Sequence, residues 1–233
     1  MADLRVFPDR AALAQAAADW FVEHVAQNDG RVAVCLAGGS TPESLYRLLA
    51  ARDLPWDRMH FFWGDERFVP PDDPRSNARM ARVALLDHVP VPPQNIHPVP
   101  TGAASPGEAA SLYEAELRRF YGADELASEQ PLFDVVFNGM GDDGHTASLF
   151  PGSPALEETG RWAVAAAPGM EPYVPRVTLT LPVLESCQAA AFLVSGAGKN
   201  AMLKRVLAGE DLPAARLQPV GSLTWFADAA AAA

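Results

Sequence analysis

The sequence predicts an α/β protein with a mostly parallel sheet that helices cover on both faces. Short apolar runs of strand length alternate with longer helix-like segments along all 233 residues. This alternation is typical of parallel strands joined by crossover helices. Hydrophobic residues make up 49% and charged residues 20% of the chain, a composition that fits a folded protein and argues against disorder.

The first expected element is a helix over residues 9–27, which is rich in alanine and carries Leu13, Trp20, Val22 and Val25 at roughly helical spacing. The remaining elements follow from apolar runs and their spacing. Strands are expected over 32–37, 59–63, 133–137, 162–166, 177–181 and 190–194, and helices over 41–51, 77–88, 108–120 and 199–207.

Residues 89–107 are rich in proline and glycine, which predicts a long surface connection. Strands continue in the same style after it, so one domain spanning residues 1–233 is expected. The alanine tail, 229–233, is expected to fray.

Charge and cysteine usage exclude several classes of protein. The formal net charge of −11 disfavours nucleic acid and anionic membranes as partners. The two cysteines, Cys35 and Cys187, form neither a metal motif nor a disulfide framework. No apolar run has the length of a signal peptide or of a transmembrane span, about 18 residues. A cytoplasmic protein with no obligate protein partner, no cofactor and no metal is expected.

The most informative stretch is 139–149, directly after the expected strand 133–137 and Asn138. Its three glycines permit a tight turn and leave room for a ligand. Histidine side chains exchange protons near neutral pH, and Asp143 stands two residues before His145. The alternative is a histidine with a core or capping role, but the surroundings favour an active-site loop.

A second glycine-rich turn, 37–43, leaves a strand and opens a helix. Ser40 or Thr41 is expected to cap that helix, with Glu43 completing a capping box. Gly38 and Gly39 would expose backbone N–H groups at a helix N-terminus, which favours anions such as phosphate. The alternative is a well-capped helix without a ligand.

Charged groups follow the strand 59–63. Asp65 and Arg67 could position a polyhydroxylated substrate or take part in acid–base chemistry, and Arg75 follows in a segment that also offers a helix cap. The alternative here is a local salt bridge on a solvated loop.

The last turn, 195–199, places Lys199 after two glycines at an expected helix start, a natural contact for phosphate. For Lys199, the alternative is a solvated lysine in the first turn of the helix. Arg176, just before the strand 177–181, is a weaker candidate for the same phosphate contact. These turns together suggest a phosphorylated sugar as the ligand. No metal-binding spacing and no Gly-x-Ser-x-Gly motif is present.

The same motifs resemble those of the 6-phosphogluconolactonase family, in order and across nearly the whole chain. The matching segments are 37–42, 64–70, 139–151, 175–180 and 196–199. The chain departs from the family pattern at Asn200, where alanine is common, and at Asp142, where proline is common. The resemblance implies a Rossmann-like fold shared with phosphosugar isomerases and deaminases.

The resemblance also implies hydrolysis of 6-phospho-D-glucono-1,5-lactone to 6-phospho-D-gluconate in the oxidative pentose phosphate pathway. His145 would activate water, and either Asp143 or Asp65 would hold His145 or a substrate hydroxyl. Backbone N–H groups of the glycine loops would stabilise the carbonyl oxygen. The phosphate would be held by Lys199, Arg176 and an arginine from Arg67 or Arg75.

Two alternatives remain open. One is glucosamine-6-phosphate deaminase or a related isomerase. The sequence motifs of those enzymes differ from this chain at residues 64–67 and 146–150. The other is a non-catalytic sugar-phosphate-binding regulator, which the negative charge and the pairing of Asp143 with His145 in one turn disfavour.

Overall fold

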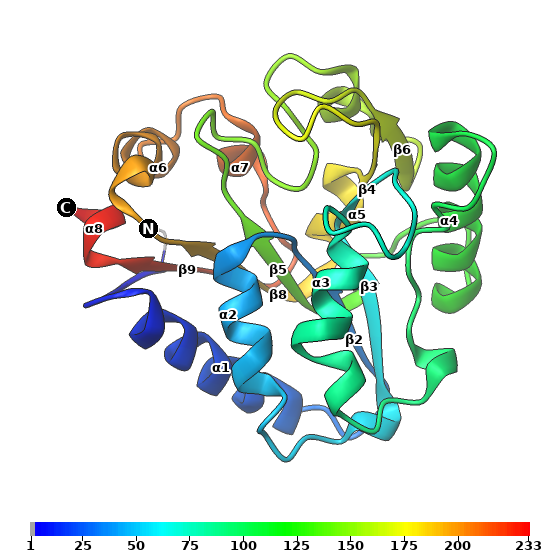
Figure 1. Cartoon of the computed structure of the whole chain (residues 1–233), viewed down its shortest axis with the longest axis horizontal. Coiled ribbons are helices and arrows are strands. Elements are labelled where there is room, and N and C mark those ends of the chain that lie inside the picture. Colours follow the sequence, from blue (N-terminus) through cyan, green and yellow to red (C-terminus); the bar gives the residue numbers. More distant parts are fainter. Residues whose placement is uncertain (1–2) are drawn as a thin grey trace.

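A six-stranded parallel sheet forms the centre of the computed structural model, which describes residues 3–233 (Figure 1). Its spatial order is β1-β9-β8-β5-β2-β3. The strands of this sheet are β1 (Asp3–Phe7), β2 (Val32–Leu36), β3 (Met59–Trp63), β5 (Phe133–Gly139), β8 (Cys187–Val194) and β9 (Ser222–Asp228). All neighbouring pairs are parallel, so the carboxyl ends of these strands meet at one edge.

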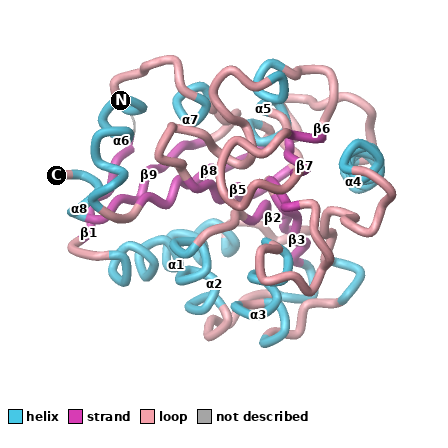
Figure 2. Tube along the Cα trace, turned by 45° about the horizontal axis from the view of Figure 1, so that its top comes forward, coloured by secondary structure: helices cyan, strands magenta, loops and turns pink. Residues whose placement is uncertain are grey.

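Helices cover both faces of the sheet, which gives three layers (Figure 2). On one face lie α1 (Arg10–Ala26), α2 (Ser40–Leu49) and α3 (Asn77–Ala84). The other face carries α4 (Pro106–Tyr121), α5 (Leu181–Glu185), α6 (Asn200–Leu207), α7 (Pro213–Arg216) and α8 (Ala229–Ala232). Short 3-10 helices complete the structure: η1 (Trp56–Arg58), η2 (Leu86–His88), η3 (Pro93–Asn95), η4 (Pro154–Glu157) and η5 (Ala197–Lys199).

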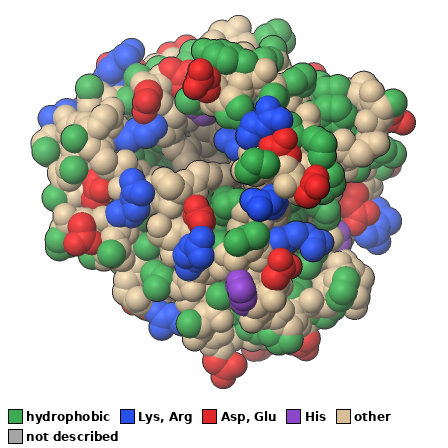
Figure 3. Space-filling view, in the orientation of Figure 1, with side chains coloured by type: hydrophobic (Ala, Val, Ile, Leu, Met, Phe, Trp, Pro, Cys, Tyr) green, Lys and Arg blue, Asp and Glu red, His purple; other side chains and the backbone are tan. Residues whose placement is uncertain are grey.

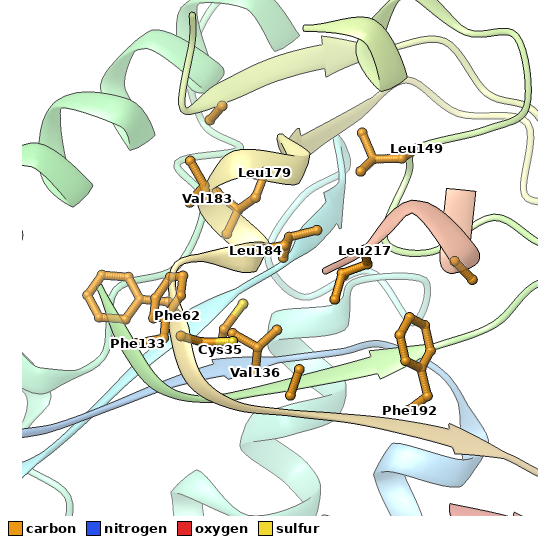
Figure 4. Close-up of a cluster of buried hydrophobic side chains, with 14 of the residues drawn as sticks. Cys35, Phe62, Phe133, Val136, Leu149, Leu179, Val183, Leu184, Phe192 and Leu217 are labelled. Atoms are coloured by element: carbon orange, nitrogen blue, oxygen red, sulfur yellow. The ribbon is translucent and has the colours of Figure 1, made fainter. Parts of the chain in front are cut away.

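The pleat of each strand divides the core into two clusters. In β2, Val34 and Leu36 pack toward α1 and α2, while Ala33 and Cys35 pack toward the opposite layer. Because all five residues of β2 are buried, its sequence has no polar alternation. Figure 4 shows part of the second cluster, where Cys35 and Val136 of neighbouring strands lie beneath Leu184.

A smaller antiparallel sheet lies beside the second cluster, with the order β4-β7-β6. It consists of β4 (Asp65–Arg67), β6 (Ala163–Ala166) and β7 (Arg176–Leu179). The backbone N–H of Leu179 donates to Gly64 O at 2.8 Å, which ties this sheet to the end of β3. The small sheet therefore stands directly over the carboxyl edge of the large one.

The predicted fold class is confirmed, and the sequence missed three strands. β1 is exposed along almost its whole length, so it lacks the apolar signal of an interior strand. β4 is a three-residue strand in a polar run that was expected to be a loop. β9 was not recognised in the sequence, and it lies between β1 and β8.

The expectation of a frayed tail is wrong. Residues 229–232 form α8, whose first turn is capped by the Asp228 carboxylate, which accepts from the Ala231 N–H at 2.8 Å. The Asn200 amide donates to Ala231 O at 3.1 Å and to Ala233 O at 2.6 Å. Asn200, a departure from the family pattern, thus holds the end of the chain.

The segment around Arg75 holds the helix cap expected there, whereas the capping box expected at residues 40–43 is absent. Ser76 caps α3, accepting from the Arg79 N–H at 3.1 Å. The expected capping box of α2 does not form, because Gly39 is the N-cap residue with φ of 104°. Glu43 instead pairs with Arg47 at 2.6 Å.

The order of strand connections opens a crevice between β2 and β5. The chain passes from β2 outward to β3, and later returns to the other side of β2 to form β5. Such a reversal separates the loops at the carboxyl ends of the two strands and is where open α/β sheets bind ligands. No helix of residues 3–233 is long and apolar enough to cross a membrane.

Candidate active site

A cavity of about 200 Å³ opens at this crevice. The turns after β2 and β5 form two of its walls, and the small sheet forms a third. The surface is hollowed near the upper centre of Figure 3, with lysine and arginine side chains on both sides of the hollow. The cavity therefore gathers residues from segments that are more than 100 positions apart in the sequence.

His145 lies in the turn after β5 and contacts the cavity with its ring. Its Nδ1 lies 2.6 Å from Asp143 Oδ1, and its backbone N–H donates to the same oxygen at 3.1 Å. The ring also packs against Phe150, with centroids 4.6 Å apart. These contacts fix the ring and direct Nδ1 toward the carboxylate, which leaves Nε2 for a ligand.

The turn needs glycine where the ring passes the backbone. A Cβ at Gly141 would lie 2.0 Å from Nδ1 of His145. The Gly141 N–H donates to the His145 carbonyl at 2.8 Å and closes the turn. The glycines of this stretch therefore serve the packing of the histidine as well as the bend of the chain.

Asp143 is held in its ionised form. Partial burial raises the pKa of its carboxyl, but hydrogen bonds from the backbone and ring of His145 outweigh this and lower the pKa below its ordinary value. An ionised Asp143 accepts the Nδ1 proton and favours the tautomer whose Nε2 is free to take a proton.

Arg67 and Arg176 stand opposite each other in the β4–β7 pair, and both contact the cavity. Like charges directly opposite on neighbouring strands repel. Burial lowers the pKa of Arg176, yet a guanidinium keeps its charge at any physiological pH. An anion between the two arginines would relieve this repulsion.

Buried donors without partners support the same conclusion. Within residues 3–233, Arg67 Nε, Arg176 Nε and Asn138 Nδ2 have no hydrogen-bond acceptor, and all three residues contact the cavity. A buried donor left unsatisfied costs about 1–3 kcal/mol. The three residues also bring N–H-bearing side chains to the cavity wall, which favours a ligand rich in oxygen.

Asp65 is already engaged by its neighbours. Its Oδ2 accepts from Ser148 Oγ at 2.5 Å and lies 3.9 Å from Arg176 Nη1. The Asn77 amide donates to Asp65 O at 2.9 Å. Asp65 lines the cavity but forms no hydrogen bond with His145, whose carboxylate partner is Asp143.

Lys199, Gly38 and Gly39 also contact the cavity. The ammonium of Lys199 lies 2.5 Å from Asp142 Oδ1. A Cβ at Gly38 would lie 2.1 Å from Asn77 Oδ1, so the turn after β2 needs glycine where it passes the start of α3.

Three candidate residues lie outside the cavity lining. Thr41 is buried in α2, and Ser40 Oγ instead accepts from Arg10 Nη1 at 3.5 Å. Arg75 is exposed, and its guanidinium is paired with Asp73 at 2.6 Å. Of the two arginines proposed after β3, the structure brings only Arg67 into the cavity.

Sequence reasoning missed several cavity residues. Asn138 was seen only as the end of a strand, although a buried polar residue at that place signals a ligand contact. Asn77 was expected only as the first residue of the helix 77–88. Met170 and Glu171 belong to an irregular loop without any periodic signal. No group of three or more metal-ligating side chains occurs among residues 3–233.

The model of the glucosamine-6-phosphate isomerase and 6-phosphogluconolactonase family matches residues 8–225, most of the chain. The chain belongs to this family. A curated family member from Nostoc sp., named 6-phosphogluconolactonase, is 43% identical, and the alignment covers 99% of this chain and 97% of that protein.

Solved structures of the family have the same fold. The 6-phosphogluconolactonase of Trypanosoma brucei superposes with a TM-score of 0.88 at 30% identity, covering 100% of this chain and 98% of that one. A monomeric glucosamine-6-phosphate deaminase superposes with a TM-score of 0.82 at 21% identity, covering 99% and 98%. The second likeness shows the shared fold alone.

Proposed function

We propose that this chain hydrolyses 6-phospho-D-glucono-1,5-lactone to 6-phospho-D-gluconate, the second step of the oxidative pentose phosphate pathway, in the cytoplasm. The observation that carries the proposal is the ordered His145–Asp143 pair in the cavity that Arg67 and Arg176 also line. The His145–Asp143 pair provides acid–base chemistry, and the two arginines provide a site for a phosphate. The names of the curated relatives support the same substrate.

His145 acts as the general base. Its Nε2 takes a proton from water while the water oxygen attacks the lactone carbonyl carbon, C1. Asp143 Oδ1, which lies 2.6 Å from Nδ1, accepts the Nδ1 proton in a hydrogen bond and stabilises the imidazolium that forms. This arrangement is a carboxylate–histidine pair acting on water rather than on a serine.

The same histidine then acts as the acid. The C1–O5 bond breaks as the tetrahedral intermediate collapses, and the imidazolium gives its proton to O5. The new carboxylic acid loses its proton to solvent, so the product is a carboxylate with a free hydroxyl at C5. Every step uses water and side chains of this chain.

The remaining cavity residues bind and orient the substrate. Arg67, Arg176 and Lys199 hold the phosphate, whose negative charge offsets the repulsion between the two opposed arginines. Backbone N–H groups of the glycine loops are the donors for the carbonyl oxygen as negative charge develops there. Asp65 holds Ser148 and Arg176 in place.

The decisive test is hydrolysis of freshly generated lactone, followed through the 6-phosphogluconate formed. The lactone also opens unaided, so the measured quantity is the rate with protein divided by the rate without it. We expect an increase proportional to the amount of protein. A folded sample that gives no increase would refute the proposal, and glucosamine 6-phosphate would then be the next substrate to test.

The role of His145 has its own test. Replacing it in His145→Ala should lower kcat by about 10²–10⁴, because general acid–base catalysis contributes this much, while KM changes little. The matched control is His88→Ala, since His88 is exposed and its ring hydrogen-bonds only to the Val83 carbonyl. Near wild-type turnover in folded His145→Ala protein would disprove the mechanism.

A further inference from the structure

Lys199 is paired with a carboxylate in the structure. Asp142 Oδ1 lies 2.5 Å from Lys199 Nζ, and among residues 3–233 Lys199 is the sole ion-pair partner of Asp142. The two residues come from different turns, one after β5 and one after β8. Asp142 adjoins Asp143, whose carboxylate is already engaged by His145.

We propose that Asp142 competes with the substrate for Lys199. The Asp142 carboxylate pairs with the Lys199 ammonium in the free protein, and the phosphate of the substrate displaces it on binding. The inference rests on the proposed function, in which Lys199 contacts the phosphate. It assigns Asp142 a role in setting the affinity for phosphorylated ligands, distinct from the chemistry of His145 and Asp143.

The burial of the two partners shows why the pair can open. The Asp142 side chain is 75% exposed, whereas that of Lys199 is 26% exposed. A freed Asp142 carboxylate returns to water at little cost, since exposed ion pairs are weak. Lys199 meanwhile stays at the cavity, where it is one of the cations that line it.

Competition is expected even if both anions contact Lys199 together. Two acceptors of one ammonium each lie about 2.8 Å from its nitrogen, so their oxygens are within about 5 Å of each other. A dianionic phosphate and a carboxylate at that separation repel. In either arrangement, Asp142 weakens phosphate binding and speeds release of the phosphorylated product.

The variant Asp142→Asn removes the charge and keeps the shape of the side chain. We expect KM for the lactone, and the inhibition constant of inorganic phosphate, to fall about 2- to 5-fold, as expected for loss of an exposed competing charge. The matched control is Asp19→Asn, because Asp19 on α1 forms an ion pair of the same length, 2.5 Å, with Arg52, and neither of these lines the cavity. This control should leave both constants unchanged.

A double-mutant cycle ties the effect to Lys199. In a Lys199→Gln background, Asp142→Asn should change neither constant, because the cation that brings the exposed carboxylate and the phosphate close together is gone. An unchanged or higher KM in Asp142→Asn, or a decrease that persists without Lys199, overturns the inference. A higher KM would mean that Asp142 positions Lys199 for the substrate instead.

Failure of the inference can be told apart from failure of the proposed function. If the wild type does not accelerate lactone hydrolysis, the function fails, and calorimetry with inorganic phosphate then tests the ion pair directly. Tighter phosphate binding by Asp142→Asn than by wild type and Asp19→Asn supports the inference, and equal binding refutes it.

Discussion

Gly141 shows how closely single residues are fitted around His145. The ring of His145 occupies the space where any other residue would carry its Cβ, and Asp143 Oδ1 would lie 2.8 Å from that Cβ as well. Both members of the acid–base pair would have to move to admit a methyl group. The position is constrained by the histidine, and not by its own backbone conformation.

We therefore predict that Gly141→Ala lowers kcat by at least about tenfold, because displacing the base by a fraction of an ångström disrupts its alignment. Circular dichroism and thermal unfolding should show that the protein still folds. Gly102→Ala is the matched control, since a Cβ there meets no atom within 4 Å. Equal turnover in the two variants would contradict the steric role of Gly141.

At the scale of elements, α3 supports one wall of the cavity. Ser76 caps this helix and donates to Glu66 Oε2 at 3.0 Å. Glu66, which is buried, also accepts from the N–H groups of Asn77 and Ala78, both at 2.7 Å. The start of α3 is thus tied to β4, which carries Arg67.

The variant Ser76→Ala removes the cap and one donor to Glu66. We expect the free energy of unfolding to fall by about 1–2 kcal/mol, as for loss of a helix cap with an added hydrogen bond. KM should also rise, because Asn77 and Arg67 lose their support. Urea unfolding and steady-state kinetics measure both effects. Ser44→Ala is the control, since Ser44 bonds only to the Ser40 carbonyl on the exposed side of α2.

At the scale of the whole molecule, a pair of histidines lies away from the cavity. His60 lies near the start of β3, and its Nδ1 is 3.1 Å from Nε2 of His97, whose Nδ1 is 2.7 Å from Glu116 Oε1. Burial, the neighbouring His97 and the Arg31 charge lower the pKa of His60 to about 4. Burial also lowers the pKa of His97, against the pull of Glu116.

This pair should make stability depend on pH. The unfolded chain protonates His60 near pH 6.5, whereas the folded chain does so only near pH 4. Between these values the unfolded state binds more protons, so stability falls as the pH drops from 6.5 to 4. Urea midpoints across this range should fall less steeply in His60→Gln than in wild type. Parallel pH profiles for the two proteins would contradict this assignment.

The sequence by itself determined the fold class and the places where chemistry is located. The interior strands are apolar runs because both of their faces are buried, and the turns after β2, β3, β5 and β8 stand out by their glycines and charges. These signals are local, so they can be read from neighbouring residues. They were sufficient to name His145, Asp143, Arg67, Arg176 and Lys199, and the structure brings these five side chains to one cavity or to its edge.

Only the tertiary structure decided which candidates meet. It paired His145 with Asp143 rather than Asp65, placed Arg67 opposite Arg176, and left Arg75 on the surface. It also supplied Asn138 and Asn77 to the cavity and formed the strands β1, β4 and β9. These features depend on register between strands that are far apart along the chain. Local sequence carries no information about such distant pairings, because the free energy that selects them comes from packing in the assembled core.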